Sequence, residues 1–392
     1  MKILYSALDQ TVPGTKGGSV HVMAVAEGLA ALGHDVCVLA PRGRGALPPG
    51  IAWTGMEPPF GAKALRWMRT GAVTRIAREF QPDAVIERYY NFGGEAIASG
   101  AAVGAITVLE VNAPVIDYPG SKKALLDRAL LVQPMRRWRE RLCAQADVIV
   151  TPTAAILPAG VDPGKIVQLE WGADTDRFRP GAAGPVPFER DTPTLAVFAG
   201  AFRSWHGAIH LVRAIELLER RGRTDISAVL IGDGPERPNV EAAAKHVRGV
   251  RIVGAIAHER MPAALAAADI GVAPFDIAAH RPLSLGFYWS PLKIFEYMAA
   301  GLPVVAPAVG RLPQLVGHER EGILYDASEP GALATALERS SDPGLRRQFG
   351  SAARERAVRD YSWAAHCRTL ADAIRAAAAA RLTAASPGGR RT

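Results

Sequence analysis

A lysine and a glutamate stand three residues apart, as Lys293 and Glu296, in an apolar stretch with helix signals at both ends. Ser290 is a common N-cap residue, and Pro291 suits the first helical position, where no backbone N–H is needed. Gly301 supplies the left-handed residue that often ends a helix, and a strand is expected directly after it. The stretch therefore predicts a short helix whose first turn carries the lysine.

The chemistry of this predicted helix is that of an anion site followed by a hydroxyl site. Free N–H groups at a helix N-terminus attract anions, and Lys293 adds positive charge there. Glu296 lies one turn further among apolar neighbours, where a carboxylate is costly unless it accepts hydrogen bonds, and ribose hydroxyls are suitable donors. The pattern predicts a nucleotide-sugar site formed by Ser290, Pro291, Leu292 and Glu296. The alternative is a Lys293–Glu296 pair on an ordinary amphipathic helix.

The same stretch resembles the donor-binding motif of family 4 glycosyltransferases, which have the GT-B fold. That motif has two glutamates separated by seven residues, followed by Ala-x-Gly-x-Pro-Val. Glu296 matches the second glutamate, which in the family holds the donor ribose. Tyr288 occupies the place of the first glutamate. The chain shares this departure with a subgroup that carries Ser-Pro-Leu-Lys before the second glutamate.

A second resemblance starts at Phe198, near the end of the expected strand 194–200, and covers the expected loop 201–206 that follows. The family pattern here is Phe-x-Gly-Arg-x-x-x-x-Lys-Gly, whose arginine and lysine neutralise the donor diphosphate. The chain keeps Gly200, has Ala201 in the place of the arginine and His206 in the place of the lysine. Arg203 lies two residues after Ala201, so positive charge is kept but moved.

The resemblance implies that Arg203, His206 and Lys293 are the catalytic residues, because cations stabilise a leaving diphosphate. His206 would be only partly charged near neutral pH unless phosphate raises its pKa, which a bound phosphate should do. The alternative is that the segment is a polar loop with a histidine at a helix start.

Two further strands complete the expected donor side. Gly232 lies in a tight turn after the strand 227–231, and Gly254 lies in the next expected strand, 251–256. In the family, the backbone after that glycine, here Gly254, Ala255 and Ile256, pairs with the donor base. Because backbone pairing leaves no side-chain record, the sequence does not identify the base.

The chain opens with a strand, a glycine-rich loop, a helix from Ser19 to Leu32 and a second strand, which make a βαβ unit. Gly17 and Gly18 let a ligand approach backbone N–H groups closely. The loop carries neither the dinucleotide fingerprint nor a P-loop. It resembles the opening of family 4 enzymes, where it faces acceptor and donor phosphates, so Gly17 is assigned to the acceptor and Gly18 to the donor. Otherwise the glycine pair serves helix packing.

Two polar residues at expected strand ends are assigned to the acceptor. Arg88 ends the strand 83–88, and Asn112 follows the strand 106–111. Family members commonly have a histidine near the reacting sugar at the second of these places. Asn112 does not transfer protons, which puts a histidine-based mechanism in doubt, but its amide bonds sugar hydroxyls. The alternative is that Asn112 simply belongs to a turn.

Two runs of alternating strands and helices predict an α/β protein of two doubly wound, Rossmann-like parallel sheets facing each other across a cleft, which is the GT-B fold. The second run begins after a stretch rich in Pro, Gly and Ala, which is the expected linker. The predicted division is an acceptor-side domain at 1–180, a linker at 181–193, a donor-binding domain at 194–362, a helix crossing back at 363–382 and a disordered tail at 383–392.

Composition limits the class of protein. The chain of 392 residues is 49% hydrophobic and 21% charged, which is typical of a globular protein. Its three scattered cysteines favour a reducing cytoplasm, and neither a signal peptide nor a membrane span is expected. The net charge of +8 favours anionic partners.

Two basic segments, 62–80 and 122–144, could place the enzyme on an acidic lipid surface at the inner face of the membrane, although a solvated charged face is the common alternative. They carry no recognisable nucleic-acid reading element, so no nucleic-acid partner is expected. The basic residues of the second segment are Lys122, Lys123, Arg128, Arg136, Arg137, Arg139 and Arg141.

The sequence thus predicts a glycosyltransferase that moves a sugar from a nucleotide diphosphate to a glycan, lipid-linked or small-molecule acceptor. Family resemblance implies retention of the anomeric configuration, with no metal and no cofactor. The chain's Asp-x-Asp, Asp174 to Asp176, is expected to be a turn rather than a ligand pair. The alternatives are a nucleotide-sugar epimerase of the same fold and a non-catalytic subunit that binds nucleotide sugars.

Overall fold

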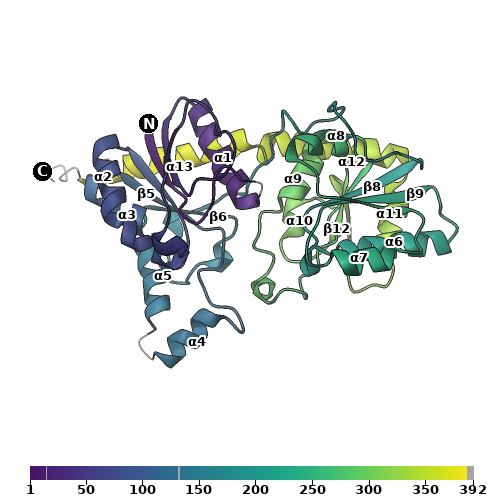
Figure 1. Ribbon diagram of the computed structural model, residues 1–392, viewed down its shortest axis with the longest axis horizontal. Helices are drawn as coiled ribbons and strands as arrows, with labels where there is room; N and C mark the ends of the chain where they lie inside the picture. Colours follow the sequence, from purple (N-terminus) through teal and green to yellow (C-terminus); the bar gives the residue numbers. More distant parts are fainter. Residues whose placement is uncertain (15, 131–132, 386–392) are drawn as a thin grey trace, which may run out of the picture. The chain divides into compact units, whose positions relative to one another are not determined.

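The computed structural model describes residues 1–14, 16–130 and 133–385, which form two compact units (Figure 1). Each unit is a layered α/β structure and is described by itself. Unit 1 comprises Met1–Trp171, Tyr288–Ser290 and the chain from Trp363 onward. Unit 2 comprises Gly172–Phe287 and Pro291–Ser362.

Unit 1 contains a seven-stranded parallel sheet in the order β3-β2-β1-β4-β5-β6-β7. In its centre, Ile3 of β1 lies between Val36 of β2 and Ala84 of β4. The strands are β1 (Lys2–Ser6), β2 (Asp35–Ala40), β3 (Ala52–Gly55), β4 (Ala84–Arg88), β5 (Ile106–Glu110), β6 (Val148–Thr151) and β7 (Ile166–Gln168). The helices are α1 (Gly17–Ala31), α2 (Thr70–Phe80), α3 (Glu95–Val103), α4 (Lys122–Ala129), α5 (Pro134–Gln145) and α13 (Trp363–Ala385), with short 3-10 turns η1 (Pro59–Gly61), η2 (Lys63–Arg69), η3 (Ala154–Ile156) and η4 (Pro163–Lys165).

Helices cover both faces of this sheet, which explains why its strands are apolar without alternation. Ile3 and Tyr5 of β1 point into a core shared with α1 and α13. Leu4 points to the opposite face, into a core shared with α2 and α3. α13 packs closely on α1 because Gly28 of α1 has no side chain. A Cβ there would lie 2.5 Å from the sulfur of Cys367 in α13.

Unit 2 contains a six-stranded parallel sheet in the order β10-β9-β8-β11-β12-β13. Leu211 and Ile215 of α6 and Leu337 of α11 are fully buried in the core on one face of it. The strands are β8 (Thr194–Ala199), β9 (Ile226–Ile231), β10 (Val250–Gly254), β11 (Ile270–Val272), β12 (Val304–Pro307) and β13 (Gly322–Tyr325). The helices are α6 (Ala208–Arg220), α7 (Arg237–Ala244), α8 (Met261–Ala266), α9 (Leu292–Ala299), α10 (Leu312–Leu315), α11 (Ala332–Ser340) and α12 (Pro343–Asp360), with turns η5 (Ser204–His206), η6 (His258–Arg260) and η7 (Arg281–Leu285).

In both sheets the chain first adds strands to one side and then returns to add strands on the other side. The strand order therefore reverses between β1 and β4 in unit 1, and between β8 and β11 in unit 2. In open parallel sheets, ligands bind beyond the carboxyl ends of the strands at such a switch point. Each unit thus has one expected ligand edge.

The predicted segments differ from the structure in several places. The segment 122–144 is two helices, because Pro134 opens α5 and Gln133 before it has a left-handed φ of 48°; its residues 131–132 lie outside the described residues. The segment 62–80 is η2 followed by α2, and α1 begins at Gly17 rather than at 19.

The predicted domain limits also differ from the limits of the two units. Residues 172–180 belong to unit 2 rather than to the first domain, because Ala173 donates its N–H to Tyr361 O at 2.7 Å and Arg354 donates to the carbonyls of Thr175 and Phe178. α13 runs to Ala385, so it includes the start of the predicted tail. The rest of that tail, 386–392, lies outside the described residues.

Candidate functional site

α9 brings the predicted donor residues to the carboxyl edge of the unit 2 sheet. It approaches β11 closely because Gly271 has no side chain: a Cβ there would lie 2.4 Å from the Tyr297 ring. The Tyr297 hydroxyl accepts a hydrogen bond from the Ala199 N–H at 2.7 Å, at the end of β8. The first turn of α9 therefore lies beside the loop that follows β8.

The predicted cap of this helix is wrong. α9 begins at Leu292, Pro291 holds the N-cap position, and no side chain caps the helix. The Ser290 hydroxyl instead donates to Glu170 Oε2 at 2.7 Å and accepts the Trp171 N–H at 3.0 Å, within unit 1. Four predicted donor-side residues of this stretch (Pro291, Leu292, Lys293 and Glu296) therefore lie in unit 2, and Ser290 lies in unit 1.

Lys293 is enclosed and lacks a hydrogen-bond partner for its amine among the described residues. The side chain is 8% exposed, and its Nζ lies 4.0 Å from the centre of the Phe198 ring and 5.2 Å from that of Phe275. A Cβ added at Gly200 would lie 2.9 Å from Nζ, so the missing side chain makes room for the amine. Loss of hydration lowers the pKa of Lys293 to about 7 despite the nearby Glu296.

Glu296 is half-buried one turn along the same helix. Loss of hydration raises the pKa of its carboxyl to about 7, and Lys293 and Arg177 oppose that rise. Lys293 and Glu296 form no ion pair in the described structure. The helix therefore presents two ionisable groups of opposite charge that are each displaced from their ordinary pKa values.

His206 and Arg203 lie on the loop after β8, next to this helix. His206 hydrogen-bonds through Nδ1 to Ala201 O at 2.7 Å, and burial together with the Lys293 charge lowers its pKa to about 3. The ligand-free histidine is therefore neutral, with Nδ1 as the donor and Nε2 left as an acceptor. Arg203 is exposed, with its guanidinium 5.7 Å from the Trp205 ring.

The predicted glycines form adjoining turns at the same edge. Gly200 and Gly232 have φ of 144° and 152°, and a Cβ on Gly232 would lie 1.9 Å from Gly200 O. Gly232 also donates its N–H to Gly254 O at 2.9 Å. These turns end β8, β9 and β10, so Gly200, Gly232 and Gly254 come together, with Ala255 exposed and Ile256 half-buried directly after them.

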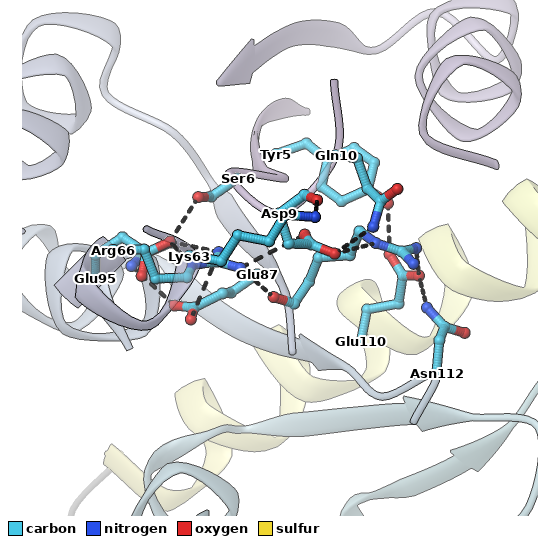
Figure 2. Close-up of polar contacts among 12 residues, drawn as sticks. Tyr5, Ser6, Asp9, Gln10, Lys63, Arg66, Glu87, Glu95, Glu110 and Asn112 are labelled. Atoms are coloured by element: carbon cyan, nitrogen blue, oxygen red, sulfur yellow. Dashed lines mark hydrogen bonds and ion pairs between the residues drawn. The ribbon is translucent and has the colours of Figure 1, made fainter. Parts of the chain in front are cut away.

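Two of the three predicted acceptor residues, Arg88 and Asn112, belong to a largely buried polar network at the carboxyl ends of β1, β4 and β5 (Figure 2). Arg88 donates to Glu110 Oε1 at 3.0 Å and to Asp9 Oδ2 at 3.3 Å. The Tyr5 hydroxyl donates to Glu110 Oε2. Burial raises the pKa of Glu110, and Arg88, Tyr5 and Asn112 oppose that rise.

Asn112 is held at both ends of its amide. Its Nδ2 donates to Glu110 Oε1, and its Oδ1 accepts the indole N–H of Trp171 at 2.7 Å. One N–H and one lone pair of the amide remain for a ligand. The alternative of a simple turn does not account for these two bonds, which fix the direction of the side chain.

The glycine pair lies in the first turn of α1. A Cβ added at Gly18 would lie 2.3 Å from Gln10 Oε1, so the Gln10 side chain covers this glycine. Gly17 is the first residue of the helix. Gly17, Gly18, Arg88, Asn112 and Ser290 thus belong to unit 1, and the other predicted site residues belong to unit 2.

Several charged residues of this network are absent from the predicted site. Arg66 is fully buried and donates to Glu95 Oε1 through two nitrogens, at 2.8 and 2.5 Å (Figure 2). His21 is buried against Arg88, 3.1 Å away, and its Nε2 has no partner among the described residues. Burial raises the pKa of Glu87 to about 7 and lowers that of His21. Glu87 had a sequence signal, a charge in the largely apolar strand 83–88, whereas Arg66 of η2 and His21 of α1 had no signal of that kind.

A cavity of about 740 Å³ lies beside the donor residues rather than on them. It is lined by α6, by α11 and by the loop after β11, and Phe275 forms part of its wall. In the described ranges, no group of three or more His, Cys, Asp or Glu side chains is placed to hold a metal ion. No helix there is long and apolar enough to cross a bilayer.

Comparison with known proteins identifies the family. Residues 15–177 match the family described as Glycosyltransferase Family 4, and residues 193–342 match that described as Glycosyl transferases group 1. The chain belongs to glycosyltransferase family 4.

Two relatives and one solved structure illustrate how much of this glycosyltransferase is matched. It is 25% identical to a GDP-mannose-dependent alpha-mannosyltransferase of Corynebacterium glutamicum over 92% of this chain and 86% of that one. It is 27% identical to D-inositol 3-phosphate glycosyltransferase 2 of Catenulispora acidiphila over 94% and 92%. A sucrose-phosphate synthase of Thermosynechococcus elongatus has a similar structure, with a TM-score of 0.68, 20% identity and coverage of 97% and 99%.

These matches and the two parallel-sheet units confirm the predicted GT-B fold and enzyme class. The protein is a glycosyltransferase that uses a nucleotide-sugar donor. The relatives carry glycosyltransferase names, so they give no support to the epimerase and binding-subunit alternatives.

Proposed function

We propose that this glycosyltransferase transfers its sugar with retention of configuration and without a divalent metal, to a hydroxyl of a glycan or lipid-linked acceptor. The proposed donor site is the carboxyl edge of the unit 2 sheet, with Lys293 acting on the diphosphate and Glu296 on the ribose. Arg88 and Asn112 of unit 1 are proposed to bind the acceptor.

The observation that carries this proposal is the enclosed Lys293 amine. Its three N–H bonds lack an oxygen or nitrogen partner among the described residues, and a buried donor without a partner is unfavourable. It lies beside Gly200 in the first turn of α9, where helix N–H groups favour an anion. A diphosphate entering this turn would supply the missing acceptors.

The proposed metal independence rests on the charges available at that turn. A leaving diphosphate develops negative charge, which cations and helix dipoles offset. Lys293 and Arg203 supply positive charge, and a bound phosphate would raise the pKa of His206 from its low ligand-free value. His206 Nε2 would then become a third donor at the same edge.

A binding panel of nucleoside diphosphates tests the proposed donor site. Lys293→Met removes the charge and keeps the length of the side chain, so affinity for the preferred nucleoside diphosphate should fall by about 10- to 100-fold. Lys245→Met, at an exposed lysine after α7, is the matched control and should bind normally. Equal affinity of the Lys293→Met variant and the wild type would remove Lys293 from the site.

The proposal includes peripheral attachment to an acidic membrane, because unit 1 exposes apolar side chains among basic ones. Leu125 and Leu126 of α4 and Leu130 directly after it are 59%, 46% and 52% exposed, and Figure 1 shows α4 at the lower tip of unit 1. Trp67 and Met68 of η2 are also exposed. The Trp67 ring contacts that of Trp138 in α5, and the Asp127 carboxylate of α4 accepts two backbone N–H groups at the start of α5, so η2, α4 and α5 adjoin.

The basic residues around this surface differ in their availability. Arg136, Arg137 and Arg141 are exposed, whereas Arg139 is 2% exposed and paired with Asp117 at 2.9 Å. Arg139 therefore stabilises unit 1 through this ion pair and is not available to contact lipid. An amphipathic surface of this kind gains affinity from apolar insertion and from attraction to anionic headgroups.

Vesicle sedimentation tests the membrane surface. The wild type should sediment with vesicles containing phosphatidylserine, less so as salt rises, and only weakly with neutral phosphatidylcholine vesicles. Leu125→Ser/Leu126→Ser should lose most of that binding. Val358→Ser, an exposed apolar residue of unit 2, is the control and should bind normally. Binding that is equal for both vesicle types, or unaffected by the leucine changes, would contradict the proposed surface.

A further inference from the structure

The Lys293 amine is surrounded by aromatic rings where hydrogen-bond acceptors would be expected. Phe198 comes from the end of β8, and Phe275 comes from the loop after β11. Nζ lies within 6 Å of both ring centres, at 4.0 and 5.2 Å, which is the range in which a ring face attracts a cation. Removal of water from the site strengthens that attraction.

The two rings differ in how they are packed in unit 2. Phe198 is fully buried in the β8 core and lies 5.8 Å from Phe202. Phe275 lies at the edge of the site, with its ring 4.8 Å from that of Phe287 and 6.0 Å from that of His206, and it also forms part of the wall of the 740 Å³ cavity. Phe275 is therefore the ring whose removal would least disturb the sheet.

Among the charged groups around the amine, only Glu296 favours its charged form. Glu296 on the same helix attracts the amine but forms no ion pair with it in the described structure. His206 on η5 is neutral when ligand-free, and Arg203 before it carries the same charge as the amine. The ring faces therefore favour the charged amine together with the longer-range attraction of Glu296.

We propose that Phe275 is a positioning residue of the donor site, whose ring, with that of Phe198, holds the Lys293 amine as a cation beside Gly200. This inference rests on the proposed function of Lys293, because it concerns how that residue is kept ready for a diphosphate. Phe275 does not touch the diphosphate itself. It acts by keeping the amine charged in a place without hydrogen-bond acceptors.

The pH dependence of kcat/KM for the donor tests this role, because it reports ionisations of the free enzyme. An amine with a pKa of about 7 gives the profile an alkaline limb. Phe275→Leu removes the ring face and keeps an apolar side chain, so the limb should move to lower pH by roughly half to one pH unit. Phe275→Tyr keeps the ring, so its limb should stay at the wild-type position.

One control variant and one independent measurement make the result interpretable. Phe349→Leu removes a buried ring of α12 that is not one of the two rings facing the Lys293 amine, and it should leave the limb unchanged even if it lowers stability. Nucleoside diphosphate binding by calorimetry across the same pH range should show the same displacement for Phe275→Leu without depending on catalysis.

The outcomes separate this inference from the proposed function. If Lys293→Met weakens diphosphate binding but Phe275→Leu leaves the limb in place or moves it to higher pH, the positioning role of Phe275 is wrong and the role of Lys293 stands. If Lys293→Met binds diphosphate normally, the proposed function of Lys293 fails first. A limb that moves to lower pH in Phe275→Leu and stays in Phe275→Tyr supports the inference.

Discussion

Lys293→Met should stabilise the donor-free enzyme while weakening donor binding. A lysine whose pKa falls from 10.5 to about 7 is destabilised as a cation by about 5 kcal/mol. Attraction to the rings of Phe198 and Phe275 offsets part of this free-energy cost, of the order of 1–2 kcal/mol. Methionine fills a similar volume without a charge, so we expect the variant to gain about 3 kcal/mol at pH 6.

The gain in stability of Lys293→Met should become smaller as the pH rises. The folded pKa is lower than the unfolded one, so the unfolded state binds more protons between pH 7 and 10.5 and wild-type stability rises with pH in that window. The advantage of Lys293→Met should therefore be largest below pH 7 and smaller by about 2–3 kcal/mol at pH 9.

Calorimetric unfolding at pH 6 and pH 9, at constant ionic strength, measures this effect. For a domain of the size of unit 2, a gain of 3 kcal/mol corresponds to a rise in Tm of roughly 6–12 °C. The exposed Lys245→Met should change stability by no more than about 0.5 kcal/mol at either pH. A Lys293→Met variant that is less stable than the wild type, or equally changed at both pH values, would refute the idea that this amine is enclosed at an energetic disadvantage.

Three further predictions concern the other charged groups. Glu296→Gln should weaken nucleoside diphosphate binding by about 1–3 kcal/mol, and titration calorimetry should show that a 2′,3′-dideoxy analogue does not distinguish the variant from the wild type. Because the Glu296 pKa is raised to about 7, wild-type affinity should also fall as pH drops below 7. Arg88→Met should destabilise unit 1 by about 3–5 kcal/mol, since it leaves buried Glu110 without its arginine and leaves Asp9 with Arg66 alone, and Arg88→Met/Glu110→Gln should recover part of that loss in thermal unfolding. Turnover should persist in excess EDTA, and a requirement for added Mg²⁺ or Mn²⁺ would contradict the proposed cationic site.

Strand positions could be predicted because each strand is an apolar run bounded by loops. The expected strands 83–88 and 106–111 are β4 and β5 within one residue at each end. Helix limits were less accurate where local geometry decides them. Gln133 and Pro134 divide α4 from α5, and a left-handed glutamine has no reliable sequence signal.

The network around Arg88 could not be predicted in the same way. Its partners come from the loop after β1 (Asp9), from α1 (His21) and from β5 (Glu110). They meet only because β4 lies between β1 and β5 in the sheet, and hydrophobic periodicity does not encode strand order. Charges at strand ends marked Arg88 and Glu110, but Asp9 and His21 had no such mark, and the strand order made all four partners.

The geometry of α9 argues against an ordinary surface pair as the role of Lys293 and Glu296. Two opposite charges three residues apart on an exposed helix would contact each other and keep nearly ordinary pKa values. Here the amine has turned toward Phe198 and Phe275, the two groups form no ion pair in the described residues, and burial moves the pKa of each toward 7. Such an arrangement is unfavourable until a ligand supplies acceptors to the amine and donors to the carboxylate. A diphosphate joined to a ribose carries both in one molecule, so donor binding should relieve both groups at once.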